Sequence, residues 1–380
     1  MLSGVRAYVK ADCKKTFRIG RKKMIKFSLL SIPFVVALIQ LTLGASIASA
    51  GAGDRAAAED DCISTGEKCF HLEIGAGVSR FNLPDNEFFY GGETIGGQES
   101  RPLTVIDTSV GGWNIAGSLG HHENGEILGS DMFGFDINGI YHEFTSSGSL
   151  SRVRDGGNVF GWIEEDGDFQ QTDSTPERLD ADVSRKFQYW IINFVGELDY
   201  NQKNGDEHVY TGSEPMFSLQ VGPSFRRIRE KTTQNGAIRN HATNALSTSV
   251  VNNEKLTTNY YGWTFAGEFV KNLDEEWAIT GTGAFSVYRA KSKASTSYAD
   301  DQGNSFSRSL SKNKNTTALN LDVKVSHKLD ASNQIAVNIG IDSLRYAPKV
   351  NYSESKLDDG DLFGYAFGVR FIRTFNSPIN

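Results

Sequence analysis

Hydrophobic and polar residues alternate along much of the chain, and a period of two is typical of β-strands. In TALNLDVKVSHKL, Leu319 and Leu321 fall on one face, and Asn320 and Asp322 fall on the other. Ten segments show this pattern, and all are longer than the five or six residues usual for a strand. We expect strands over 70–79, 106–119, 131–144, 187–200, 216–229, 259–271, 276–290, 317–329, 334–346 and 362–375.

Two folds accommodate long alternating strands. In a soluble sandwich or barrel the apolar face points inward, whereas in a transmembrane barrel it meets lipid and the polar face lines the lumen. The strands are long enough for the roughly 9–11 tilted residues that a membrane requires. Their polar faces combine small residues with opposite charges, which suits a narrow lumen. Aromatic residues near strand ends are expected to form interfacial belts, namely Tyr189, Tyr261, Trp277 and Tyr346.

The gaps between these strands favour the membrane barrel, because they alternate between long and short. The gap 145–186 has 42 residues, whereas 272–275 and 330–333 have four each and are built largely from Asn and Asp. Long extracellular loops and short periplasmic turns are typical of outer-membrane barrels. The sequence therefore predicts an all-β, antiparallel transmembrane β-barrel of about ten strands over 70–375. Twelve strands remain an alternative, since Val159–Ile163 could open another hairpin.

The first fifty residues have the pattern of an export signal. A Lys-rich stretch precedes an uncharged apolar run, which ends in Ala48-Ser49-Ala50. We expect a signal peptide over 1–50, with 1–23 as a candidate gene-model extension and an uncleaved anchor as the alternative. A periplasmic segment follows over 51–69, and the tail is 376–380. Cys62 and Cys69 are candidates for a short-loop disulfide in an oxidising compartment.

Charge excludes one class of partner. The chain has 39 Lys and Arg against 46 Asp and Glu, but nine of the basic residues and one acidic residue lie in 1–50. The remainder carries 30 basic and 45 acidic residues, a net charge near −15. Nucleic-acid binding requires clustered Lys and Arg, so we expect no nucleic-acid partner.

Over 70–375 the chain resembles bacterial outer-membrane β-barrel proteins as a class. The resemblance rests on the alternation, the loop asymmetry and a terminal strand that ends in Phe375. It implies insertion into the outer membrane of a Gram-negative cell, contact with its lipid and lipopolysaccharide, and recognition of the last strand by the barrel assembly machinery. Arg373 and the trailing residues 376–380 depart from the usual terminal pattern.

Catalytic motifs are sparse. The sequence has no GxSxG, HExxH, Walker A or paired CxxC motif, and it suggests no cofactor and no metal site. His121-His122-Glu123 could offer metal ligands, but it falls in a predicted periplasmic turn, so we expect a solvated turn.

Asp206-Glu207-His208 resembles the Asp-x-His element of omptins, the ten-stranded outer-membrane proteases. That resemblance implies a His base polarised by an Asp on the external rim. Here six predicted strands follow His208, which places it on the periplasmic side, and no matching acidic pair is evident upstream. An omptin-like protease is therefore the least favoured of three functions.

The other two functions involve the extracellular loops and the lumen. A ten-stranded barrel lies near the closed end of the size range, so inward charges are expected to form an internal ion-pair network. The favoured function is a structural or surface-interaction role carried by the extracellular loops, mainly 145–186 and 230–258. The alternative is a narrow porin-like channel for small solutes. The inward candidates by parity are Glu73, Arg226, Glu268, Asp322, Lys324, Asp342 and Arg370.

Overall fold

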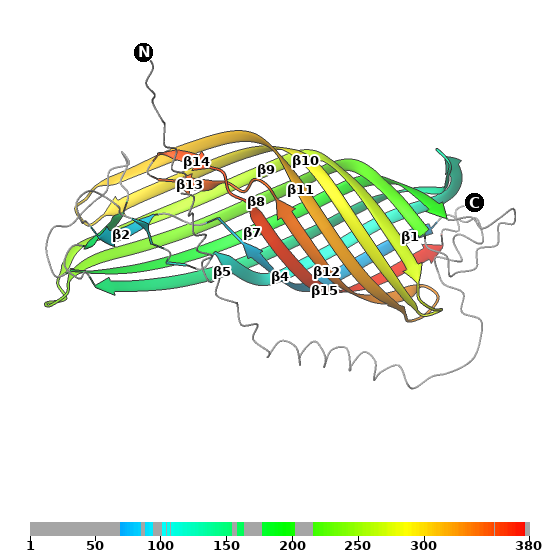
Figure 1. The fold of residues 1–380 in the computed structure, drawn as a ribbon, viewed down its shortest axis with the longest axis horizontal. Coiled ribbons are helices and arrows are strands. Elements are labelled where there is room, and N and C mark those ends of the chain that lie inside the picture. Colours follow the sequence, from blue (N-terminus) through cyan, green and yellow to red (C-terminus); the bar gives the residue numbers. More distant parts are fainter. Residues whose placement is uncertain are drawn as a thin grey trace, which may run out of the picture. The chain divides into compact units, whose positions relative to one another are not determined.

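A computed structural model describes residues 69–84, 88–93, 101–103, 105–106, 108–153, 158–162, 177–201, 216–352 and 354–376. Ten antiparallel strands form a closed barrel (Figure 1). The prediction of a ten-stranded all-β barrel is thus confirmed. The barrel strands are β1 (Cys69–Asn82), β4 (Ser109–Ile127), β5 (Ser130–Val153), β7 (Glu177–Asn201), β8 (Met216–Asn240), β9 (Leu246–Asn272), β10 (Trp277–Asp300), β11 (Ser305–Lys328), β12 (Asn333–Leu344) and β15 (Leu362–Asn376).

The first and last strands close the sheet. β1 pairs with β15 from Cys69↔Asn376 to Asn82↔Phe363, and β1 pairs on its other side with β4. Cys69 at the start of β1 and Asn376 at the end of β15 lie at the same end of the barrel as the turns 273–276 and 329–332. We call this end the short-turn end.

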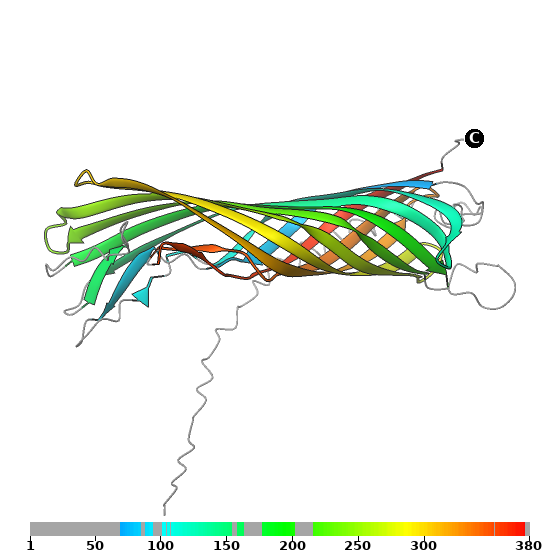
Figure 2. The ribbon, with the colours of Figure 1, turned by 90° about the horizontal axis from the view of Figure 1, so that it is seen from above.

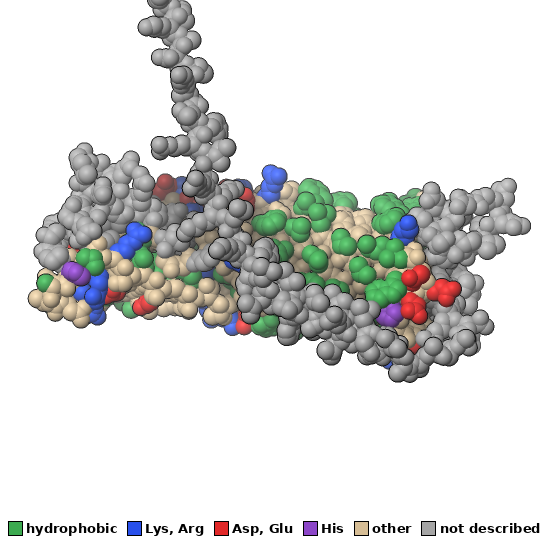
Figure 3. Space-filling view, turned by 60° about the horizontal axis from the view of Figure 1, so that its bottom comes forward, with side chains coloured by type: hydrophobic (Ala, Val, Ile, Leu, Met, Phe, Trp, Pro, Cys, Tyr) green, Lys and Arg blue, Asp and Glu red, His purple; other side chains and the backbone are tan. Residues whose placement is uncertain are grey.

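The outer wall carries a band of exposed apolar side chains. On β9, Trp263 and Phe265 are 53% and 51% exposed, and Phe285 on β10 is 48% exposed. Such a surface is unfavourable in water, but it matches the hydrocarbon layer of a bilayer. Figure 3 shows apolar side chains gathered over one half of the visible face, whereas the other half is mainly polar. No helix in the described residues is long and apolar enough to cross a membrane.

Six strands continue well beyond this band. β8 and β9 have 25 and 27 residues, whereas a membrane crossing needs about 9–11. We call the part of β5 and β7–β11 beyond the band the extension (Figure 2). The predicted loop 230–258 is therefore mostly a hairpin, with its turn at 241–245. Much of the predicted loop 145–186 is also strand, as far as the described residues show.

Within the described residues, five short strands lie outside the barrel sheet. They form a three-stranded sheet in the order β3-β2-β6 and a separate β13–β14 hairpin. The segment Val159–Ile163, the candidate for two further barrel strands, instead contributes to β6, which pairs with β2. The twelve-strand alternative is therefore wrong for the described residues. The bounds are β2 (Phe89–Glu93), β3 (Arg101–Pro102), β6 (Asn158–Trp162), β13 (Lys349–Asn351) and β14 (Lys356–Asp358).

These short strands pack against the inner face of the extension. Trp162 on β6 is fully buried, and its Nε1 donates a hydrogen bond of 3.0 Å to the Tyr298 hydroxyl on β10. Val350 and Leu357 of the β13–β14 hairpin belong to the same apolar cluster as Leu256 of β9. The extension is therefore a curved sheet with its own hydrophobic core.

The N-terminal expectations fall outside the described residues. Residues 1–68 are not among the described residues. The signal peptide over 1–50 and the segment 51–69 stay predictions. The Cys62–Cys69 disulfide also stays a prediction, because Cys62 is not described.

Candidate functional site

A cluster of aromatic side chains fills the bore where the extension begins. Phe81, Phe144, Tyr189 and Tyr260 are at most 2% exposed and belong to one buried cluster, which we call the aromatic plug. The ring of Phe81 lies edge-on to the rings of Phe144 and Tyr189, with centroids 5.3 and 5.7 Å apart. Aromatic pairs at such spacing add about 0.5–1.5 kcal/mol to the burial of their surface.

Two of the four residues predicted for the aromatic belt lie inside the barrel instead. Tyr189 and Tyr346 are fully buried inside the barrel, because they occupy inward positions on β7 and just after β12. Tyr260 donates a hydrogen bond of 2.8 Å to the carbonyl oxygen of Tyr346. By contrast, Tyr261 is 50% exposed on the outer wall, and Trp277 stacks on His327 near the short-turn end.

Arg226 crosses the lumen next to the plug, where its partner Asp342 lines the cavity that extends to the short-turn end. Its side chain is 1% exposed, and Nη1 lies 2.8 Å from Asp342 Oδ1 and 2.6 Å from the Tyr189 hydroxyl. Its Nε donates to the Tyr288 hydroxyl at 2.8 Å, and Nη2 donates to Asn320. A buried charge is tolerated only when it is paired and hydrogen-bonded. This set of contacts, the Arg226 node, ties β8 to β7, β10, β11 and β12.

A second ion-pair network lies nearer the short-turn end. Glu73 on β1 pairs with Arg370 on β15 and, at 3.3 Å, with Lys324 on β11. Arg370 Nη2 also lies 3.8 Å from Asp322 Oδ2. On the other side of the bore, Glu268 accepts a hydrogen bond of 2.9 Å from Thr282. The structure therefore places all seven lumen candidates on the inner wall and divides them between this network, the Arg226 node and the β9–β10 wall.

The network surrounds a cavity of about 380 Å³. Its lining extends from Asp342 and His142, next to the node and the plug, to Met216 and Thr374 at the short-turn end. More than half of the lining residues are polar or charged, and apolar residues lie between them. The lumen therefore holds a polar cavity on one side of the plug and the apolar core of the extension on the other.

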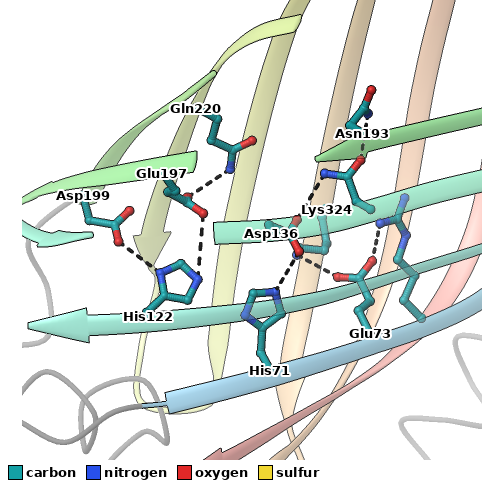
Figure 4. A network of polar contacts seen from close by, with 11 residues as sticks. His71, Glu73, His122, Asp136, Asn193, Glu197, Asp199, Gln220 and Lys324 are labelled. Atoms are coloured by element: carbon teal, nitrogen blue, oxygen red, sulfur yellow. Dashed lines mark hydrogen bonds and ion pairs between the residues drawn. The ribbon is translucent and has the colours of Figure 1, made fainter. Parts of the chain in front are cut away.

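A group of histidines and carboxylates lies in the wall of this cavity (Figure 4). His122 Nδ1 is 3.3 Å from Asp199 Oδ2, and His122 Nε2 is 3.8 Å from Glu197 Oε2. His71 Nε2 lies 3.7 Å from Asp136 Oδ1, and the two imidazole rings have centroids 5.3 Å apart. The expectation of a solvated turn at His121–Glu123 is wrong, because β4 continues to Ile127 and turns His122 inward.

Two glycines make room for these histidines. Gly120 lies between His71 and Asp136 in the strand register, and a Cβ there would lie 1.9 Å from His71 Cε1. Gly134 lies in the same way between His122 and Glu197, where a Cβ would lie 2.9 Å from His122 Nδ1. Each imidazole therefore lies across a glycine and meets a carboxylate two strands away.

The extension holds a separate buried carboxyl group. Glu254 on β9 is 5% exposed and accepts a hydrogen bond from the Tyr352 hydroxyl, and Tyr352 also accepts one of 3.0 Å from Asn252. Burial raises the pKa of Glu254 to about 7, and the neighbouring Glu230 carboxylate contributes to the rise. Arg185 offsets part of this effect, and it pairs with Glu230 at 2.5 Å.

No protein-family model matches the chain, and no curated protein matches it. Among solved structures, it is similar to the outer membrane protease OmpT from Escherichia coli, with a TM-score of 0.36 and 10% identity over 81% of this chain and 97% of that one. The outer membrane protein OprG from Pseudomonas aeruginosa has a TM-score of 0.26 and 13% identity, over 82% of this chain and 99% of that one. For Ail of Yersinia pestis the TM-score is 0.20 and the identity 10%, over 80% of this chain and 97% of that one. These similar structures are bacterial outer-membrane β-barrels, and the closed barrel of this chain is shown by its own strand pairing. These likenesses concern fold alone.

Asp206 and His208, on which the omptin resemblance rests, lie outside the described residues. The flanking strand ends, Asn201 of β7 and Met216 of β8, pair with each other at the short-turn end. Counting strands from the C-terminus predicts this same end for the connection between β7 and β8.

The Arg226 node predicts a strong effect on stability. Arg226→Ala would leave the Asp342 carboxylate buried without its cation, and breaking a buried pair costs about 3–5 kcal/mol. The double variant Arg226→Ala/Asp342→Ala should recover part of this loss. Denaturant unfolding in detergent measures both, with Arg239→Ala as a control at a half-buried arginine on the same strand. An equal loss in the control would contradict the role of the node.

The raised pKa of Glu254 predicts that the extension loosens as pH increases. A group whose pKa is raised by folding stabilises the fold fully below its unfolded pKa, near 4.5, and loses that contribution as the pH passes about 7. Hydrogen exchange of amides in 246–258 should therefore be faster, relative to intrinsic rates, at pH 8 than at pH 5.5. Glu254→Gln should remove most of this dependence, and an unchanged dependence would contradict the assignment.

Proposed function

We propose that this chain is an exported outer-membrane barrel that acts at the cell surface through its extension and outer wall, with a bore closed to solutes. The filled lumen is the observation that carries the proposal. The Arg226 node, the aromatic plug and the core of the extension follow one another along the bore. Eight-stranded barrels are filled by side chains and wide pores have 16–18 strands, so a filled bore is reasonable for ten.

The orientation follows from the two ends of the barrel. Outer-membrane barrels have short periplasmic turns and longer extracellular connections. The short-turn end therefore faces the periplasm, which also suits delivery by the predicted signal peptide. The extension then rises from the cell surface, with the β8–β9 turn at 241–245 and the β10–β11 turn at 301–304 at its tip. These hairpins and the β13–β14 hairpin are the surfaces offered to partners.

A row of cations supports contact with anionic lipid on the outer leaflet. On β8 and β10, outward basic residues begin directly after the last apolar ones, Phe225 and Val287. Arg227 lies over the ring of Trp190 at 5.9 Å, and Lys291 lies over Tyr261 at 5.8 Å, so the row adjoins interfacial aromatic residues. We call this row the basic belt, and it consists of Arg227, Arg229, Lys231, Arg289, Lys291 and Lys293.

Lipopolysaccharide is the partner that fits this position. Its phosphate groups lie just outside the hydrocarbon layer, where the belt lies, and a cation near an anionic membrane surface contributes about 1 kcal/mol. The barrel assembly machinery is the second expected partner, because β15 presents Phe371 and Phe375 on its outer face near its end, with exposures of 45% and 41%.

The narrow channel is the alternative that the polar cavity would favour if the plug opened. Reconstitution in planar bilayers distinguishes the two. The closed bore predicts no stepwise current above that of empty bilayers, whereas a water-filled path would produce discrete steps. A refolded sample that migrates faster unheated than boiled on a gel ensures that folded barrel was tested. Stepwise current from such a sample would contradict the closed bore.

The basic belt predicts a charge-dependent affinity for lipopolysaccharide. Lys231→Gln/Lys291→Gln/Lys293→Gln should weaken binding about 100-fold, since three contributions of about 1 kcal/mol each are lost. Binding to lipopolysaccharide micelles in dilute salt is the measurement. The control Lys312→Gln/Lys314→Gln/Lys356→Gln removes the same charge from lysines that pair with Asp359, Asp358 and Glu354. Equal weakening by both triple variants would contradict a specific belt.

A further inference from the structure

The group formed by His122, Glu197 and Asp199 has the spacing of a metal site. One ligand atom from each side chain lies within 4.8 Å of the other two. Two ligands bound at about 2.1 Å to a tetrahedral ion lie roughly 3.4 Å apart. The separation of 3.3 Å between His122 Nδ1 and Asp199 Oδ2 already matches this value. Glu197 Oε2 lies 3.8 Å from the other ring nitrogen, Nε2, so the Glu197 side chain would turn toward Nδ1 to complete a three-ligand set.

The charges around this group favour a cation. Glu197 and Asp199 are 7% and 3% exposed, and among the described residues each forms its ion pair with His122. One imidazolium cannot balance two buried carboxylates. In the same cavity, Asp136 is 8% exposed, and its Oδ1 makes no hydrogen bond to the described residues and has only the 3.7 Å contact with His71 Nε2. Burying carboxylates without compensation is costly, and a divalent ion would offset that cost.

The surroundings position two of the three side chains, Glu197 and His122. Gln220 on β8 donates a hydrogen bond of 3.0 Å to Glu197 Oε1, which leaves Oε2 directed at His122 (Figure 4). Gly134 provides the space in which the His122 ring crosses β5. Hydrogen bonds that fix ligand orientation are a regular part of metal sites, because they set the direction of the donor atoms. The cavity of about 380 Å³ supplies the space through which an ion would reach them.

We propose that the barrel binds one first-row transition-metal dication between His122, Glu197 and Asp199, and that Zn²⁺ is a representative ion. Imidazole with carboxylates suits this class, whereas calcium prefers six to eight oxygen ligands. Three protein ligands leave a fourth position open to the cavity. The bound ion would join β4 to β7 across β5 at the short-turn end.

Zinc binding to untagged, refolded protein in detergent tests the proposal. Equilibrium dialysis with Zn²⁺ as the only added metal should give one ion per chain. Co²⁺ should give visible absorption that Zn²⁺ abolishes and an equal concentration of Ca²⁺ does not. His122→Gln, Glu197→Gln and Asp199→Asn should each weaken binding by more than about 100-fold. Gln220→Leu should weaken it by about 10–100-fold, as is usual for a residue that orients a ligand.

The neighbouring residue provides the matched control. His121 precedes His122 on β4, and its ring stacks on Phe70 with centroids 4.5 Å apart, on the opposite wall of the strand. His121→Gln should bind Zn²⁺ as the parent chain does. Each variant is scored only if it keeps the faster migration of a folded barrel, and the four site variants are independent tests of the same site. Absence of zinc binding in the parent chain, equal loss in His121→Gln, or displacement by Ca²⁺ would overturn the proposal.

Discussion

Pairing of β1 with β15 leaves the barrel sheet without a free edge in the apolar band. In hydrocarbon no water is present to satisfy backbone N–H and C=O groups, so a sheet can cross a membrane only if it closes. Closure also gives each residue one of two environments, because alternate side chains point to the outer or the inner wall. The exposed Trp263 and Phe265 and the inward Thr264 express this division on β9. The lumen network and the cavity follow from it.

Beyond the band the solvent changes, and so does the direction of the apolar side chains. On β9 they occupy the odd positions Tyr261, Trp263 and Phe265 within the band, and the even positions Leu256 and Val250 in the extension. Water surrounds the outer wall there, so the apolar residues turn inward and pack under the short strands. The bore is filled by this inversion together with the aromatic plug.

The same inversion explains which parts of the fold could be predicted from the sequence. Alternation within the band located all ten barrel strands, because lipid demands an apolar residue at every second outward position. The sequence predicts loops where the extension lies, because the apolar positions change parity near Asn259 and the outward alternation ends there. Parity also put Arg226 and Asp342 on the inner wall, but their direct contact depends on the arrangement of β8 and β12 around the bore. His122 was missed because its partners Glu197 and Asp199 lie two strands away, and the sequence gives no register across β5.

The division of the bore from the lipid-facing wall can be measured residue by residue. NMR of the refolded barrel, with a water-soluble and then a lipid-soluble paramagnetic agent, reports which side chains each medium reaches. The account predicts that the lipid-soluble agent broadens Trp263 and Phe265, while neither agent broadens the plug residues Tyr189 and Tyr260. Broadening of Tyr189 and Tyr260 by the water-soluble agent would show a hydrated, open bore and would contradict the account.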